Sequence, residues 1–318
     1  MAPDENHPLL LQIPAPSPKP SPLQRLKKFL GFSKRYNFIQ WIFMFCLMFI
    51  VMMNGLNFIG NLSIRFAPGE WYWFRQPFYK FGIILHLATI LPCGFLAVFQ
   101  FVPAIRYKYI SLHRLNGFMV YTLLGLGIVG ALMLTRRAMG GAPSTQVALI
   151  IIASLSATSA CLAWYSIRFR RRIDLHRRWN IRTAFYAGSA ITERIFLNGL
   201  APILATQSEK QYFVWTCDEL QFLIGNGTEV LLRYPSCIQF SVAPVPASLS
   251  SAEGVGTALR IAFSASTLLG IAFHAVLAEV YLQATWSESE RLEQVSKAKE
   301  LARVRAATIP SNPPDHAM

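Results

Sequence analysis

The stretch LHRLNGFMVYTLLGLGIVGAL, residues 112–132, decides the fold. After its polar opening it contains no charged side chain, and about 20 such residues form a helix that crosses the ~30 Å hydrocarbon core of a bilayer. Similar stretches recur along the chain, and the predicted spans are 38–60, 81–102, 112–134, 147–167, 181–204 and 257–283. The sequence therefore predicts an all-α integral membrane protein, a bundle of about six transmembrane helices.

Composition supports this class. Of the 318 residues, 53% are hydrophobic and only 14% are charged, and the mean hydropathy is +0.36. A soluble domain of this size would be less apolar. The formal net charge is +14, but its basic residues follow the ends of the spans, so we expect the lipid bilayer and no nucleic acid as a partner.

Basic residues gather at three places that would share one side of the membrane. Lys and Arg near span ends are retained in the cytoplasm, so we expect both termini there. The residues concerned are Lys19, Arg25, Lys27, Lys28, Lys34 and Arg35 before the first span, Arg106, Lys108 and Arg114 after the second, and Arg168, Arg170, Arg171, Arg172, Arg177 and Arg178 after the fourth.

The opposite face has features of a lumen. Asn61-Leu-Ser and Asn226-Gly-Thr are glycosylation sequons, and Cys217 and Cys237 share the long loop 205–256, where an oxidising lumen would permit a disulfide. The expected location is the endomembrane system, that is, the endoplasmic reticulum, vacuole or plasma membrane. An alternative topology turns residues 212–232 into a further span, but three acidic residues make that costly, and we favour a structured luminal loop.

Three segments follow from these patterns. Residues 1–37 are Pro-rich and expected to be disordered, apart from a basic amphipathic stretch before the first span, and residues 5–10 resemble an acidic dileucine sorting signal. Residues 38–283 form the membrane domain. Residues 284–318 form a charged cytoplasmic tail whose alternating charges predict a solvated helix.

One motif occurs twice, as SLHRLNG at residues 111–117 and DLHRRWNIR at residues 174–182. Ser111 and Asp174 are suitable N-cap residues, which would place His113 and His176 at the second helical position. The positive end of a helix dipole keeps a histidine there neutral, and neutral imidazole is the form that binds haem iron.

The arginines of the motif permit two interpretations. Arg114, Arg177, Arg178 and Arg182, with two helix N-termini, would form an anion site for a lipid phosphate, haem propionates or a phosphorylated metabolite. They would equally satisfy the positive-inside rule without a ligand. His274 is placed in the same inner layer as the two motif histidines, which makes that layer the best cofactor candidate. No separate metal site is predicted.

Two further ionisable residues lie nearer the outer side. His86 and Glu193 are expected at similar depth, and they could form an acid–base pair. The alternative is that Glu193 is neutralised by the adjacent Arg194.

Three segments together resemble a family of predicted multi-helix membrane proteins of unknown function, DUF2306-like, in a form found in filamentous fungi. The matching residues are His86, Gln100, Phe101, His113, Arg114, Gly117, His176, Arg177, Arg178, Trp179, Ile181 and Arg182. The resemblance covers roughly residues 80–200 and implies a fold more than an activity. The histidine layout also resembles that of haem-carrying bundles of the cytochrome b561 type.

Three functions remain open. The first is a redox protein with one b-type haem held by two of His113, His176 and His274. The second is a cofactor-free isomerase or cyclase that acts on a lipophilic metabolite with His86 and Glu193 as acid and base. The third is a carrier or a bundle that binds an anionic lipid or solute.

Overall fold

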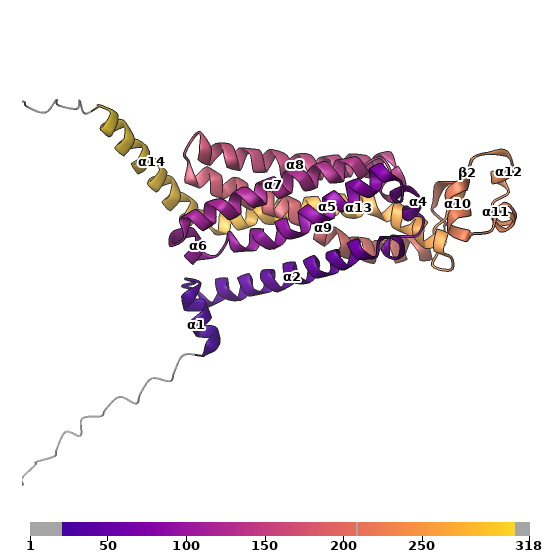
Figure 1. Cartoon of the computed structure of the whole chain (residues 1–318), viewed down its shortest axis with the longest axis horizontal. Coiled ribbons are helices and arrows are strands. Elements are labelled where there is room, and N and C mark those ends of the chain that lie inside the picture. Colours follow the sequence, from indigo (N-terminus) through magenta and orange to yellow (C-terminus); the bar gives the residue numbers. More distant parts are fainter. Residues whose placement is uncertain (1–20, 208, 309–318) are drawn as a thin grey trace, which may run out of the picture.

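Six long helices run side by side along the longest axis of the molecule (Figure 1). The structure is a computed structural model that describes residues 21–207 and 209–308. The bundle helices are α2 (Arg35–Gly60), α5 (Pro77–Phe99), α7 (Ile110–Leu134), α8 (Pro143–Arg168), α9 (Ile173–Thr206) and α13 (Ala252–Ala284). The predicted helical membrane bundle is confirmed, and its helices extend beyond the apolar spans at one or both ends.

Five helices of the described chain are long and apolar enough to cross a membrane, namely α2, α5, α7, α8 and α13. The sixth, α9, has 34 residues and packs against α8 and α13 in the same bundle. Its charged side chains, among them Arg177, Arg182 and Glu193, make it the most polar of the six. This is the helix that carries the second copy of the motif.

The bundle consists of two groups of consecutive helices. In one, α5 packs against α7 and α2, and in the other α9 packs against α13 and α8. Gly130 permits a close approach of the α5 and α7 backbones, because a Cβ there would lie 2.6 Å from the backbone nitrogen of His86. Cys93, Leu124 and Ala160 form a small buried cluster that joins the two groups.

A small folded cap connects α9 to α13. It contains β1 (Tyr212–Thr216), α10 (Cys217–Ile224), α11 (Gly227–Arg233), α12 (Ser236–Gln239) and β2 (Val242–Pro246), with β1 and β2 antiparallel. Trp215, Leu220 and Val245 form its core, and a disulfide joins Cys217 to Cys237 with a Cα–Cα distance of 5.8 Å. Residues 212–232 thus form β1, α10 and part of α11 rather than one long helix, and the placement of the loop in a lumen stays a prediction.

A buried ion cluster, here called the clamp, fixes the cap to the bundle. It consists of Glu70 in α4 (Glu70–Phe74), Glu219 in α10 and Arg260 in α13. Arg260 Nη2 lies 3.3 Å from Glu70 Oε1 and also binds Glu219. Backbone N–H groups of Met139 and Gly140, in the 3₁₀ helix η1 (Ala138–Gly141), donate to Glu70. Burial raises the pKa of Glu70 to about 7.

The opposite end of the bundle, here called the basic end, carries α1 (Pro22–Phe29), α6 (Pro103–Tyr107) and α14 (Trp286–Thr308). The short helix α3 (Leu62–Arg65) follows α2 at the cap end. Both described ends of the chain lie at the basic end (Figure 1). The tail is helical as predicted, but it is not solvated on all sides. Ser296 Oγ accepts from Ile173 N at 3.1 Å, and Leu292 is buried, so α14 packs against the start of α9.

Residues 5–10, with their dileucine pattern, lie outside the described residues. The amphipathic stretch is seen as α1, where Leu23 and Phe29 are exposed beside Lys27 and Lys28. Such a helix suits the surface of an anionic leaflet.

Candidate functional site at the basic end

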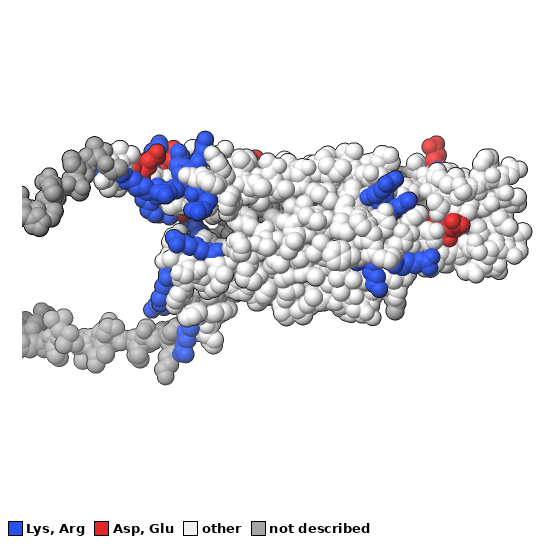
Figure 2. All heavy atoms as spheres, turned by 45° about the horizontal axis from the view of Figure 1, so that its top comes forward, with Lys and Arg blue, Asp and Glu red and all other residues white. Residues whose placement is uncertain are grey.

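Basic side chains gather at the end of the bundle that carries α1, α6 and α14 (Figure 2). Both copies of the repeated motif lie there, since α7 and α9 each begin at this end. The cap end shows few charged residues on the same face (Figure 2). The asymmetry agrees with the positive-inside pattern, and the assignment of this end to the cytoplasm stays a prediction.

The predicted N-caps are wrong by two residues. The N-cap of α7 is Tyr109 and that of α9 is Arg172, and neither side chain caps its helix. Asp174 is fully buried because it forms a bidentate pair with Arg172, at 2.9 and 3.0 Å, that holds the preceding turn. The two motif copies nevertheless occupy equivalent positions, since His113 and His176 are both the fourth residue of their helices.

The two motif histidines lie near each other, at the same level of the bundle. His113 lies within electrostatic range of His176, and Arg106 of α6 lies within range of both. His176 Nδ1 is 2.9 Å from the carbonyl oxygen of Ala163 in α8. Because a carbonyl only accepts, Nδ1 must carry the proton, and the lone pair is on Nε2.

Both ring nitrogens of His176 lie within hydrogen-bond distance of other groups in the described chain, whereas one ring nitrogen of His113 does not. His113 Nδ1 is buried without a hydrogen-bond partner there. Asn180 Nδ2 lies 3.2 Å from both ring nitrogens of His176 and donates to its backbone oxygen at 2.8 Å. One atom cannot align with two divergent in-plane directions, so we interpret this amide as packed on the ring. The Nε2 lone pair of His176 is then available to a ligand.

Tyr121 completes this side of the site. Its hydroxyl donates to Asn180 Oδ1 at 2.8 Å and so links α7 to α9. The first motif is held in a similar way, since Gln100 Nε2 donates to the backbone oxygen of His113 at 3.3 Å. The two halves of the bundle thus position one histidine each.

The motif arginines lie toward α13 and α14. Arg182 forms a bidentate pair with Glu279 at 2.7 and 2.9 Å, so its charge is already neutralised. Arg177 donates to two neutral hydroxyls, Ser289 Oγ at 2.8 Å and Thr285 Oγ1 at 2.7 Å. Within residues 21–207 and 209–308, no carboxylate lies within salt-bridge distance of Arg177, Arg178, Arg114 or Arg106.

A recess of about 80 Å³ opens beside these arginines. Arg178 and Arg182 line the recess together with Trp286, at the start of α14. The guanidinium carbon of Arg178 lies 5.2 Å from the ring centre of Trp286. Gln283 and Ser289 add further polar groups, and the lining also includes Glu279, whose carboxylate is paired with Arg182. A group that accepts several hydrogen bonds fits such a lining.

His274 does not belong to the inner layer, which corrects the prediction. Its Nε2 lies 2.7 Å from Thr192 Oγ1, in the middle of α9. Arg177 instead contacts Thr285, which is 11 residues further along the same chain segment, or about 16 Å at 1.5 Å per residue. The depth estimate failed because the chain remains helical past the last apolar residues and continues into α14.

His86 and Glu193, the predicted acid–base pair, each have another partner in the structure. His86 Nδ1 lies 2.8 Å from the carbonyl oxygen of Gly127, and Glu193 Oε2 lies 3.2 Å from Arg194 Nε. No hydrogen bond joins His86 to Glu193 in the described chain. Glu193 Oε1 is buried and has no hydrogen-bond partner within it. A catalytic role for the pair stays a prediction.

Several residues of the site were not predicted from the sequence. Tyr121 lies in a predicted span, Asn180 lies in the second copy of the motif without an expected role, and Thr285 and Ser289 lie in a tail that was expected to be solvated. Arg260 carried a signal, since it is a charge inside the predicted span 257–283 and such a charge needs a partner. The sequons remain predictions, with Asn226 exposed in the cap and Asn61 bonded to Asn57 at the end of α2.

Known proteins share the region of the chain that contains the repeated motif. The model of the family described as "Predicted membrane protein (DUF2306)" matches residues 83–217, which confirms the resemblance. The chain is also similar to Ava biosynthesis cluster protein G of Aspergillus versicolor, with 26% identity over 309 residues that cover 81% of this chain and 91% of that protein. No solved structure matches this chain.

Proposed function

We propose that this membrane protein binds the anionic group of an amphipathic molecule at its basic end. The observation that carries the proposal is the recess lined by Arg178, whose guanidinium has no carboxylate partner in the described chain. Arg177 and Arg106 lie nearby and add two positive charges, against the one carboxylate of Glu288 that is in range and is itself paired with Arg291. Partly buried cations repel one another unless an anion lies between them.

The position of the recess selects an amphipathic ligand. Leu282 and Trp286 belong to its lining together with the polar groups, and Trp side chains favour the boundary between lipid and water. An anionic phosphate or carboxylate would pair with Arg178, while the apolar part would remain in the bilayer. The ligand could come from the membrane itself or from metabolism, and the name of the similar fungal protein, a biosynthesis cluster protein, favours a metabolite.

Binding of phosphatidic acid, compared with phosphatidylcholine, tests the proposal. The purified full chain in detergent is compared with Arg178→Gln and with Lys297→Gln, a matched loss of one charge at an exposed α14 side chain. A charge-assisted hydrogen bond contributes about 1.5–3 kcal/mol, so Arg178→Gln should weaken binding about tenfold or more. Lys297→Gln should leave it unchanged. Equal binding by all three proteins would contradict the proposal.

Mass spectrometry of molecules that copurify from the native host then separates the two sources. A phospholipid would identify a lipid site, and a non-lipid acid would identify a metabolite site.

The histidine pair supports a second candidate, one b-type haem. His113 Nδ1 has no hydrogen-bond partner in the described chain. The bond from His176 Nδ1 to the carbonyl oxygen of Ala163 orients that ring as in metal-ligating histidines. These two residues would hold the iron, with Arg114 and Arg106 toward the propionates. Haem would supply one-electron transfer.

A visible spectrum of the purified protein, oxidised and then reduced with dithionite, tests this candidate. Sharp bands that disappear in His113→Gln or His176→Gln would support it. A colourless protein from haem-replete cells would contradict it.

A further inference from the structure

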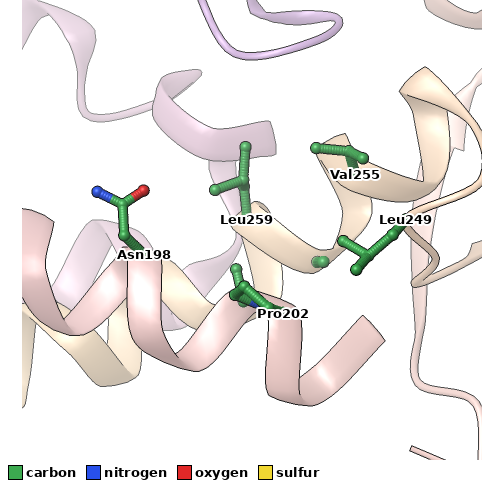
Figure 3. Close-up of a pocket in the computed structure, with 7 residues that line it drawn as sticks. Asn198, Pro202, Leu249, Val255 and Leu259 are labelled. Carbon is green, nitrogen blue, oxygen red and sulfur yellow. The ribbon is translucent and has the colours of Figure 1, made fainter. Parts of the chain in front are cut away.

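A second pocket, of about 260 Å³, lies between α9 and α13 at the cap end (Figure 3). Thr183 of α9 donates to Ser159 of α8 at 3.0 Å, and counting along these antiparallel helices places Asn198 level with the first turn of α8. The pocket therefore lies near the edge of the bilayer, about 30 Å from Arg178 along α9. It is separate from the site at the basic end.

One polar residue lines the pocket. The lining comprises Asn198, Ala201, Pro202, Leu249, Val255, Ala258 and Leu259. Figure 3 shows Asn198 and Pro202 one turn apart on α9, with Leu249 and Val255 across from them. No charged side chain takes part, which disfavours an ionic ligand.

Asn198 has unused hydrogen-bonding capacity. Asn198 is exposed, and its side-chain amide has no hydrogen-bond partner within residues 21–207 and 209–308. Pro202 lies inside α9 and has no N–H, so the backbone carbonyl of Asn198 lacks the donor that a helix normally supplies four residues later. One residue thus offers an amide N–H and two carbonyl oxygens beside an apolar cavity.

We propose that this pocket binds a neutral, lipophilic small molecule that carries a hydroxyl or amide group. Its apolar body packs against Val255, Leu259 and Leu249, and its polar group exchanges hydrogen bonds with Asn198. This combination of an apolar lining with one fixed polar group is typical of small-molecule sites. An acyl chain of a phospholipid would fill the cavity but has no group that exchanges hydrogen bonds with Asn198.

Farnesol serves as the probe, with farnesene as the analogue that lacks the hydroxyl. Binding of each radiolabelled compound is measured on the full chain in phosphatidylcholine nanodiscs. Asn198→Leu should weaken farnesol binding about tenfold, the effect of one lost hydrogen bond, and should leave farnesene binding unchanged. Val255→Phe fills the cavity and should weaken both compounds by at least about tenfold.

Ile203→Phe is the matched control, because Ile203 lies on α9, is exposed and does not line the pocket. It should bind both compounds as the wild type does. Equal farnesol binding by the wild type and Asn198→Leu would overturn the proposal. Equal retention in all four proteins would overturn it too, since partition into the bilayer would then account for the signal.

Discussion

Arg260 packs over the ring of Trp215, with its guanidinium carbon 3.6 Å from the centre of the indole ring. Both side chains are buried, and Trp215 Nε1 in turn donates to Thr257 Oγ1 at 2.8 Å, one turn before Arg260 on α13. The cap strand and the bundle helix therefore meet through a cation–π contact and a hydrogen bond. The clamp carboxylates, Glu70 and Glu219, bind the other side of the same arginine.

Arg260→Met should destabilise the protein strongly. The substitution leaves two buried carboxylates without their cation, and breaking a buried ion pair in this way costs about 3–5 kcal/mol. Thermal unfolding in detergent should show a clearly lower Tm. Arg291→Gln, which removes an exposed arginine paired with Glu288, should change the Tm little, and a similar Tm for both variants would show that the clamp does not fix the cap.

Stability should fall as the pH rises from about 5 to 7. The pKa of Glu70 is raised from 4.5 to about 7 by burial, so the folded state binds a proton that the unfolded state has released. Its stabilising contribution is complete below pH 4.5 and is lost as pH rises through 7, with a total change on the order of 3 kcal/mol. Chemical unfolding across this range measures it. In Glu70→Gln this part of the slope should be absent, and an unchanged slope would refute the assignment.

Gly130→Ala should weaken the contact between α5 and α7. A Cβ at this position would lie 2.6 Å from His86 N and 2.9 Å from Gly82 O, and both are backbone atoms that cannot move aside alone. Overpacking of this kind costs roughly 1–3 kcal/mol. Gly125→Ala is the control on the same helix, because nothing lies within 4 Å of a Cβ there. Its Tm should equal or exceed the wild-type value.

Loss of the disulfide should destabilise the cap locally and leave the helix bundle folded. Cys217 and Cys237 are 20 residues apart, and closing a loop of this length contributes about 3 kcal/mol. Hydrogen exchange in Cys217→Ser should accelerate in β1, β2 and α10 and remain unchanged in α8. Cys161→Ser, at an exposed thiol of α8, provides the comparison, and uniform acceleration over the whole chain would contradict a local role.

The long helices were predictable because an apolar stretch of about 20 residues has few alternatives in a bilayer. The equivalence of His113 and His176 was predictable as well, since the motif repeats at the start of two helices. The level of His274 was not, because it depends on how α9 and α13 align and on the helical continuation past residue 283. The clamp was not predictable either, since Glu70, Glu219 and Arg260 are brought together from three distant segments.

The division of the bundle into two groups has a consequence for biogenesis. The helices of the first group end at residue 134, before any helix of the second has been synthesised. The first three spans can therefore pack together while the ribosome is still translating α8. Glu70 belongs to the early group and Arg260 to the late one. Until translation passes residue 260, Glu70 has no cationic partner from the clamp, so closure of the clamp marks the completion of the chain.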